Sequence, residues 1–134
     1  MYKVKVTSQI SSAHYLRNYR GRCETLHGHN WKVEVALKSE RLNSIGLVVD
    51  FKYLKNILNS ILEEIDHKVL NEIDFFKKNN PSCEWLAFYI FKKMEEKLGE
   101  KSYYLSEVTV WEQENSCATY YREEEDKTPD KSLE

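Results

Sequence analysis

The sequence lacks any long run of apolar residues and any clear excess of one charge. No apolar stretch approaches the roughly 20 residues that a helix needs to span a bilayer. The N-terminus also lacks the charged and apolar regions of a secretory signal. The 20 basic and 22 acidic residues give a formal charge of -2, which offers no reason to expect nucleic acid or an anionic membrane as a partner. We therefore predict a cytoplasmic protein.

Cysteine is also scarce, with only Cys23, Cys83 and Cys117 present. An odd number of cysteines without framework spacing argues against a disulfide scaffold and fits a reducing compartment. At least one thiol is then free to react. No internal repeat or low-complexity block is found, and the length of 134 residues fits one domain. We place that domain at residues 1–122 and expect the acidic segment 123–134 to be a mobile tail.

Alternating apolar and polar residues predict two strands in the first part of the chain. In the first strand, residues 1–10, the apolar side chains alternate with lysines, and continuing this parity places His14 on the apolar face. A bulge before His14 would reverse that placement. In the second strand, residues 27–38, His27 and His29 share the parity of the apolar side chains that follow. All three imidazoles are therefore expected on the core side.

Helical spacing of apolar residues predicts two helices in the middle of the chain. The first runs over residues 51–67, with Asp50 as its N-cap. The second runs over residues 83–98, with Ser82 as N-cap and Gly99 as the stop. Both helices carry one apolar face that must pack against a sheet.

Two further strands, residues 104–113 and 116–122, are predicted to form a hairpin. Glu112 has the parity of the apolar residues in its strand, so a carboxylate faces the core unless the strand simply ends at the surface there. The complete order is strand, strand, helix, helix, strand, strand. This order predicts an α+β domain, in which a four-stranded antiparallel sheet carries both helices on one face.

The segment from Cys23 to His29 combines a thiol with two histidines in an H-x-H pair. Side chains two residues apart on a strand point the same way, so His27 and His29 can share one ion. Together with His14 they form the three-protein-ligand set that is typical of catalytic zinc. The alternative is a closed structural site in which Cys23 is the fourth ligand.

Two other groups of polar residues have open interpretations. Arg17, Arg20 and Arg22 form either a binding site for a phosphorylated substrate or a solvated loop. Asp66 and His67 place a carboxylate next to an imidazole, as a proton-transfer group requires. Their alternative is a helix C-terminus that favours a cationic histidine.

These residue types together suggest removal of a proton beside a carbonyl group. A zinc ion lowers the pKa of a bound hydroxyl and stabilises a developing alkoxide or enolate. A cation close to Cys23 would lower the pKa of the thiol, so that its thiolate can serve as a general base.

Six short segments form a specific pattern when they are taken in order: 11–14, 21–31, 48–51, 66–71, 80–84 and 108–112. The pattern resembles the 6-pyruvoyltetrahydropterin synthase superfamily, and most closely its bacterial and archaeal 6-carboxytetrahydropterin synthase branch. The three residues between Cys23 and His27 are similar to the spacing in that branch. A folate-related branch carries glutamate where this chain has Arg22.

The resemblance implies the tunnelling fold, in which the sheets of several subunits join into an oligomeric barrel, commonly a homohexamer made of two trimers. It implies active sites at subunit interfaces, zinc as cofactor and a pterin triphosphate as substrate. Zinc would be bound by His14, His27 and His29. The catalytic residues would be Cys23, together with Asp66 and His67 from a neighbouring subunit. The pterin would be anchored by Glu112, and Glu84 would line its pocket.

The implied reaction is the zinc-dependent conversion of 7,8-dihydroneopterin triphosphate to 6-carboxy-5,6,7,8-tetrahydropterin, with release of acetaldehyde and triphosphate. The resemblance thus points to a lyase of queuosine biosynthesis. Two alternatives remain. One is a 6-pyruvoyl synthase, which eliminates triphosphate without cleaving the side chain, and the other is a zinc-stabilised protein that binds a pterin without turning it over.

Overall fold

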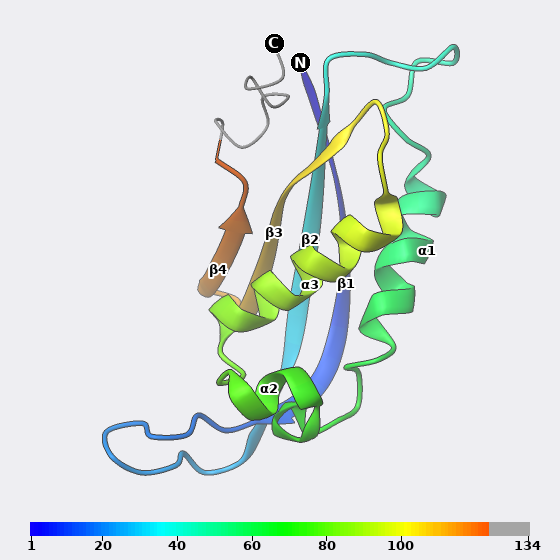
Figure 1. Cartoon of the computed structure of the whole chain (residues 1–134). Helices are drawn as coiled ribbons and strands as arrows, with labels where there is room; N and C mark the ends of the chain where they lie inside the picture. The colour runs from blue at the N-terminus through cyan, green and yellow to red at the C-terminus, as the bar shows by residue number, and fades with distance from the viewer. Residues whose placement is uncertain (124–134) are drawn as a thin grey trace.

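A four-stranded antiparallel sheet with helices packed against one face makes up the fold (Figure 1). The computed structural model describes residues 1–123, so the predicted tail lies outside the described residues except for Glu123. The strands lie in the order β1-β2-β3-β4 across the sheet. Helix α1 contacts β1, whereas α3 contacts β3 and β4. The predicted antiparallel sheet with helices is therefore confirmed.

Strands β1 (Tyr2–His14) and β2 (His27–Ser39) pair in one unbroken register, in which His14 lies opposite His27. Because no bulge interrupts β1, its alternation persists over all 13 residues. Ile10 and His14 are consequently buried on the same face. The predicted parity of the first strand is confirmed.

Strands β3 (Tyr104–Gln113) and β4 (Ser116–Tyr121) form the predicted hairpin. Their register shifts between Trp111 and Gln113, so Glu112 lies outside the regular pairing. An extra residue of this kind bends a strand and redirects its side chain. Glu112 thus occupies an irregular position in the sheet.

Helix α1 (Phe51–Leu62) begins where the sequence predicts. The carboxylate of Asp50 accepts a hydrogen bond from the Lys52 amide at 2.8 Å, as an N-cap residue does. The helix ends at Leu62, about one turn before the predicted end near residue 67.

The missing turn of α1 is explained by residues 65–69, which bond to the outer edge of β1. The His67 amide donates to the Ser11 carbonyl at 2.7 Å, and the Ala13 amide donates to the Lys68 carbonyl at 2.9 Å. Because these groups bond to a strand, they are not available to continue a helix. The last turn of the predicted helix was therefore wrong.

Helix α3 (Cys83–Leu98) matches its prediction, with Ser82 as N-cap and Gly99 at a φ of 64° just after its end. Two short helices were not predicted, the 3₁₀ helix η1 (Leu70–Glu72) and α2 (Asp74–Lys78). Both are too short to show a helical period in the sequence. No helix among residues 1–123 has the length and apolar character needed to cross a membrane.

Candidate metal centre and thiol loop

Three histidines converge where the β1–β2 pair ends. His14 closes β1 opposite His27, the first residue of β2, and His29 follows two residues later on the same face. The ring centroids are 4.7 Å apart for His14 and His27, 4.8 Å for His27 and His29, and 5.2 Å for His14 and His29. The structure brings together the three predicted metal ligands.

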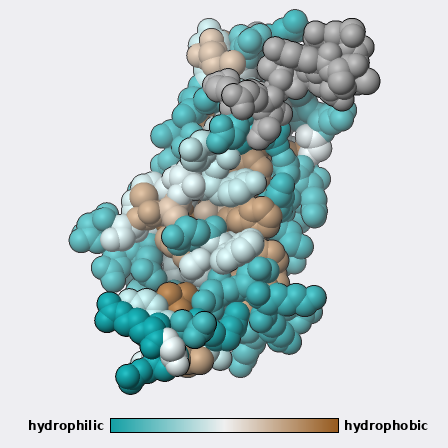
Figure 2. Space-filling view, turned by 60° about the vertical axis from the view of Figure 1, so that its left-hand side comes forward, coloured by the Kyte–Doolittle hydropathy of each residue, from teal (hydrophilic) through white to brown (hydrophobic). Residues whose placement is uncertain are grey.

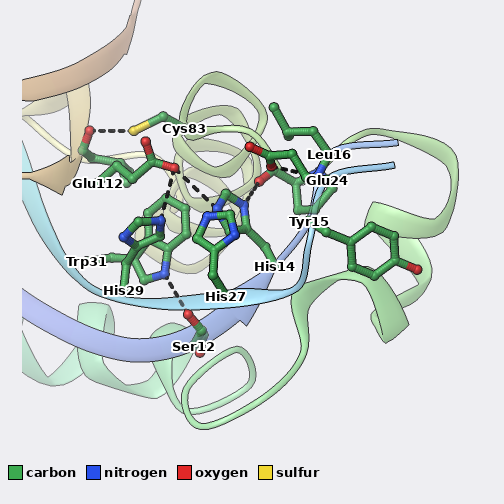
Figure 3. Close-up of polar contacts among 12 residues, drawn as sticks. Ser12, His14, Tyr15, Leu16, Glu24, His27, His29, Trp31, Cys83 and Glu112 are labelled. Atoms are coloured by element: carbon green, nitrogen blue, oxygen red, sulfur yellow. Dashed lines mark hydrogen bonds and ion pairs between the residues drawn. The ribbon is translucent and has the colours of Figure 1, made fainter. Parts of the chain in front are cut away.

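Glu112 completes this cluster from β3. Its Oε1 atom lies 3.2 Å from Nε2 of His14 and 3.4 Å from Nε2 of His29, and Figure 3 shows the carboxylate directed at the imidazoles. One potential ligand atom from each of the four residues lies within 4.8 Å of the others. We refer to His14, His27, His29 and Glu112 as the histidine–glutamate cluster.

The histidine–glutamate cluster suits a metal ion. The Nε2 atoms of His14 and His29 are buried and have no hydrogen-bond partner in residues 1–123, because the approach of Glu112 lacks hydrogen-bond geometry. A buried polar atom without a partner costs about 1 to 3 kcal/mol. Ligation of a cation would satisfy both nitrogens, and imidazole and carboxylate ligands are suitable for zinc and other divalent metals.

Carbonyl groups orient two of the rings. Nδ1 of His14 lies 2.7 Å from the Pro81 carbonyl oxygen, and Nδ1 of His27 lies 2.8 Å from the Thr25 carbonyl oxygen. A carbonyl oxygen can only accept, so Nδ1 carries the hydrogen in each contact. In the neutral ring, Nε2 then presents its lone pair, which is the usual arrangement of metal-binding histidines.

The third imidazole is also kept in the form that binds metals. Burial lowers the pKa of His29, and His14 and His27 lower it further, against the opposing charges of Glu112 and Glu24. A lowered pKa favours the neutral ring at pH 7. Metal then competes with fewer protons for this nitrogen.

The loop between β1 and β2 carries Cys23, whose side chain is exposed. Among the described residues, the cluster that could hold a metal ion contains Glu112 and not Cys23. This grouping does not match the closed site in which Cys23 would be the fourth ligand. The Cys23 thiol is instead exposed on the loop that leads into β2.

The three arginines before Cys23 differ in their surroundings. The Arg17 guanidinium donates to the Phe76 carbonyl, so it serves the fold. Arg20 lies over the ring of Tyr19, with 5.5 Å between its guanidinium carbon and the ring centroid. Arg20 and Arg22 are exposed and remain accessible to an anion.

Asp66 and His67 form an ion pair at the outer edge of β1, with 3.0 Å between Oδ1 and Nδ1. Burial of Asp66 tends to raise its pKa, but the Ser11 amide, which donates to Oδ1 at 2.8 Å, and His67 outweigh burial and lower the pKa. The His67 side chain is 80% exposed, and its φ is 56°. The Asp66 carboxylate is therefore held in place by the Ser11 amide, whereas the His67 imidazole is exposed to solvent.

An open hollow of about 500 Å³ lies beside this pair. It is lined by residues of β1, by residues of β2 that include His29, and by His67 with the two residues that follow it. The hollow brings His67 and His29 to one surface of the chain. Cys23 is not among its lining residues.

The two residues at the start of α3 have different environments. The Cys83 thiol donates to the Val110 carbonyl at 2.9 Å, and burial raises its pKa to about 12, which makes it unreactive. Glu84 is exposed in the first turn of α3.

Comparison with known proteins identifies relatives over almost the whole described chain. The family model of 6-pyruvoyl tetrahydropterin synthase matches residues 3–123. A putative 6-carboxy-5,6,7,8-tetrahydropterin synthase from Archaeoglobus fulgidus is 33% identical over 119 residues, which cover 89% of this chain and 95% of the relative. A 6-carboxy-5,6,7,8-tetrahydropterin synthase from Synechocystis is 36% identical over 92 residues, covering 65% and 70% of the two chains.

The fold is similar to that of a solved structure. The 6-pyruvoyl tetrahydropterin synthase of Caenorhabditis elegans aligns with a TM-score of 0.80 at 26% identity, over 91% of this chain and 96% of the other. Sequence and fold therefore agree, and they agree with the resemblance stated from the motifs. The chain belongs to the 6-pyruvoyl tetrahydropterin synthase family.

Proposed function

We propose that this protein is a cytoplasmic, zinc-dependent lyase of queuosine and 7-deazapurine biosynthesis. It converts 7,8-dihydroneopterin triphosphate and one water molecule to 6-carboxy-5,6,7,8-tetrahydropterin, acetaldehyde and triphosphate. The observation that carries the proposal is the histidine–glutamate cluster, in which three imidazoles converge next to a loop with an exposed thiol. The similarity to relatives that are named 6-carboxytetrahydropterin synthases supports this choice of activity within the family.

In this proposal His14, His27 and His29 hold zinc. The bound ion supplies a positive charge that stabilises oxyanions of the substrate side chain. Cys23, as the thiolate, accepts a proton from the side chain. Glu112 anchors the pterin, because a carboxylate can accept two parallel hydrogen bonds from a ring N–H and an amino group.

Asp66, His67 and Glu84 complete the proposed site. His67 exchanges protons as the side chain is cleaved and triphosphate leaves, and Asp66 holds its imidazole through the 3.0 Å ion pair. Glu84 lines the pterin pocket from the first turn of α3. Exposure of the His67 ring is consistent with a role toward a group outside its own chain.

The proposal includes a homohexamer of two trimers in a tunnelling-fold barrel, with active sites between subunits. Strands β1 and β4 are the two edges of the sheet, so each chain offers two edges for pairing. Figure 2 brings the β4 side of the molecule forward and shows apolar residues exposed among hydrophilic ones. Tyr121 at the end of β4 is 61% exposed. Assembly at this edge would cover such residues.

The test is to incubate the zinc-loaded protein with 7,8-dihydroneopterin triphosphate, with and without a chelator, and to identify the products by mass spectrometry. We expect 6-carboxytetrahydropterin and acetaldehyde, both lost when the chelator removes zinc. Unchanged substrate would contradict the enzymatic proposal and favour a binding protein.

The second candidate is a 6-pyruvoyl synthase, favoured by the similarity in fold to the Caenorhabditis elegans enzyme. This activity eliminates triphosphate and leaves the carbon side chain intact. A 6-pyruvoyl product without acetaldehyde in the same experiment would select it.

A further inference from the structure

Tyr15 and Arg17 follow the end of β1. Their backbone groups form hydrogen bonds with asparagine side chains and not with a neighbouring strand. The Tyr15 amide donates to Asn71 Oδ1 at 3.0 Å, and Asn71 Nδ2 donates to the Tyr15 carbonyl at 2.8 Å. Asn80 contacts Arg17 in the same way: the Arg17 amide donates to Asn80 Oδ1, and Asn80 Nδ2 donates to the Arg17 carbonyl, each at 2.9 Å. Each asparagine amide thus satisfies an N–H and a C=O as a neighbouring strand would. Tyr15 and Arg17 are fixed to the body of the protein.

Leu16, which lies between these two residues, bonds to Glu24. Its amide donates to Glu24 Oε1 at 3.0 Å, and the Glu24 amide donates to the Leu16 carbonyl at 2.9 Å. Figure 3 shows Glu24 beside Leu16, close to His14. Glu24 therefore closes the loop onto a residue two positions after a histidine of the cluster.

The Glu24 contact controls the part of the loop that carries the thiol. Cys23 is exposed and directly precedes Glu24 in the chain. Earlier in the loop, Asn18, Arg20 and Gly21 have positive φ angles, as in a segment that turns sharply. The pair of hydrogen bonds between Leu16 and Glu24 fixes the end of this turn that carries Cys23.

We propose that Glu24 is a positioning residue: its carboxylate accepts a hydrogen bond from the Leu16 amide, its own amide donates to the Leu16 carbonyl, and together they fix the Cys23 end of the loop that leads into β2 at His27. The catalytic consequence depends on the proposed function of Cys23. In its contact with Leu16 the carboxylate acts as a hydrogen-bond acceptor, a role that a neutral amide oxygen can also fill.

Two substitutions separate hydrogen bonding from charge. Glu24→Ala removes the acceptor of the Leu16 amide, whereas Glu24→Gln keeps an amide oxygen that can accept the same bond. Glu40→Ala is a matched control, because Glu40 is exposed just after the opposite end of β2. All variants are compared as full-length, zinc-loaded proteins.

The structural measurement is hydrogen–deuterium exchange resolved at the Leu16 amide. In Glu24→Ala we expect exchange to become at least about tenfold faster, because this amide loses its partner. Glu24→Gln and Glu40→Ala should exchange as the unmodified protein does. Unchanged exchange in Glu24→Ala would overturn the proposal without reference to any activity.

The functional measurement is turnover of 7,8-dihydroneopterin triphosphate. We expect Glu24→Ala to retain zinc and its thermal midpoint and to lose about tenfold or more in kcat with a nearly unchanged KM, since a misplaced base weakens the chemical step rather than binding. Glu24→Gln should recover most of kcat. Equal loss in both variants, or none in Glu24→Ala, would overturn the positioning role.

Alkylation separates this proposal from the proposed function. If the unmodified protein does not turn over the pterin, the proposed function fails, and the rate at which iodoacetamide alkylates Cys23 becomes the test. Positioning predicts an altered rate in Glu24→Ala and the original rate in Glu24→Gln and Glu40→Ala. An unaltered rate in Glu24→Ala would contradict it.

Discussion

At the scale of single residues, the exposed thiol of Cys23 provides a direct test. We predict that Cys23→Ala lowers kcat by about 100-fold or more, because a positioned acid or base contributes this much. Zinc content should be unchanged, since Cys23 is outside the histidine–glutamate cluster. Cys117→Ala, which removes an exposed thiol from β4, is the control. Full turnover by the Cys23 variant would exclude the thiol as the base.

Glu112 has two possible roles, as a metal ligand or as the pterin anchor. If it anchors the pterin, Glu112→Gln should raise KM about tenfold or more, because charge-assisted hydrogen bonds to the ring are weakened. Zinc content, measured by atomic absorption, should then equal that of the unmodified protein. The control is Glu114→Gln, which changes an exposed carboxylate in the adjoining turn. Zinc loss in the Glu112 variant would assign it to the metal.

Asp66 should make stability depend on pH. Its pKa is lowered in the folded chain, so its contribution is present above the ordinary carboxyl pKa of about 4 and is lost as pH falls through the folded value. Urea unfolding with chelator should show Asp66→Asn as less stable at pH 7, with the difference shrinking below about pH 4. Asp74→Asn, at a 98% exposed side chain, should show a much smaller difference. A difference that stays constant with pH would contradict this assignment.

Alternation along the strands predicted which residues would meet at the cluster, but not how they are held. His14, His27 and His29 could be placed on one face because side chains alternate on a regular strand. The Pro81 carbonyl that orients His14 is 67 residues away in sequence, and no local pattern reports such a contact. The role of Glu24 toward Leu16 was missed for a related reason, because it depends on how the loop closes.

At the scale of elements, the stability of α3 should depend on its N-cap residue, Ser82. Ser82 accepts a hydrogen bond from the Trp85 amide at 3.1 Å, and the neighbouring Pro81 carbonyl contacts His14. Ser82→Ala should lower the free energy of unfolding by about 1 kcal/mol, the usual value of an N-cap. Chemical denaturation measures this, with Ser102→Ala in the exposed loop before β3 as control. Equal stability of both variants would contradict the cap.

The sequence predicted well those elements in which a periodic apolar pattern continues over many residues and the ends are marked by specific residues. Helix α3 has both, because apolar residues recur through it and Ser82 and Gly99 mark its ends. Helix α1 has an apolar pattern that continues to Ile65, yet it stops at Leu62 because the chain bonds to β1 instead. Tertiary contacts therefore determine where α1 ends, and local periodicity alone could not predict this position.

At the scale of the whole molecule, the proposed sharing of sites between subunits has a quantitative test. Cys23→Ala and His67→Ala should each be inactive alone. When the two are unfolded together and refolded at equal amounts, random assembly should restore about a quarter of the unmodified activity, since one pairing in four unites an intact thiol with an intact imidazole. A mixture of Cys23→Ala with the double variant should stay inactive. Absence of recovery in the first mixture would place both residues in one chain.

A single sequence carries information about its own sheet, but a barrel depends on pairing between chains. The antiparallel sheet could be predicted because alternation and turns act within one chain. The outer edge of β1 is partly occupied by residues 65–69, which reduces the length open to another strand. This occupation follows from the tertiary fold and has no counterpart in the alternation of β1.

The two strands that carry the three histidines are synthesised before the rest of the domain. All three histidines belong to β1 and β2, which are complete once residue 39 has been made. Since chains fold from the N-terminus as they emerge from the ribosome, this hairpin precedes every helix of the domain. Metal binding is coupled to folding, so an ion could fix the hairpin register before Glu112 and the Pro81 carbonyl exist. Metal supply during translation would then influence how much of the newly made protein folds correctly.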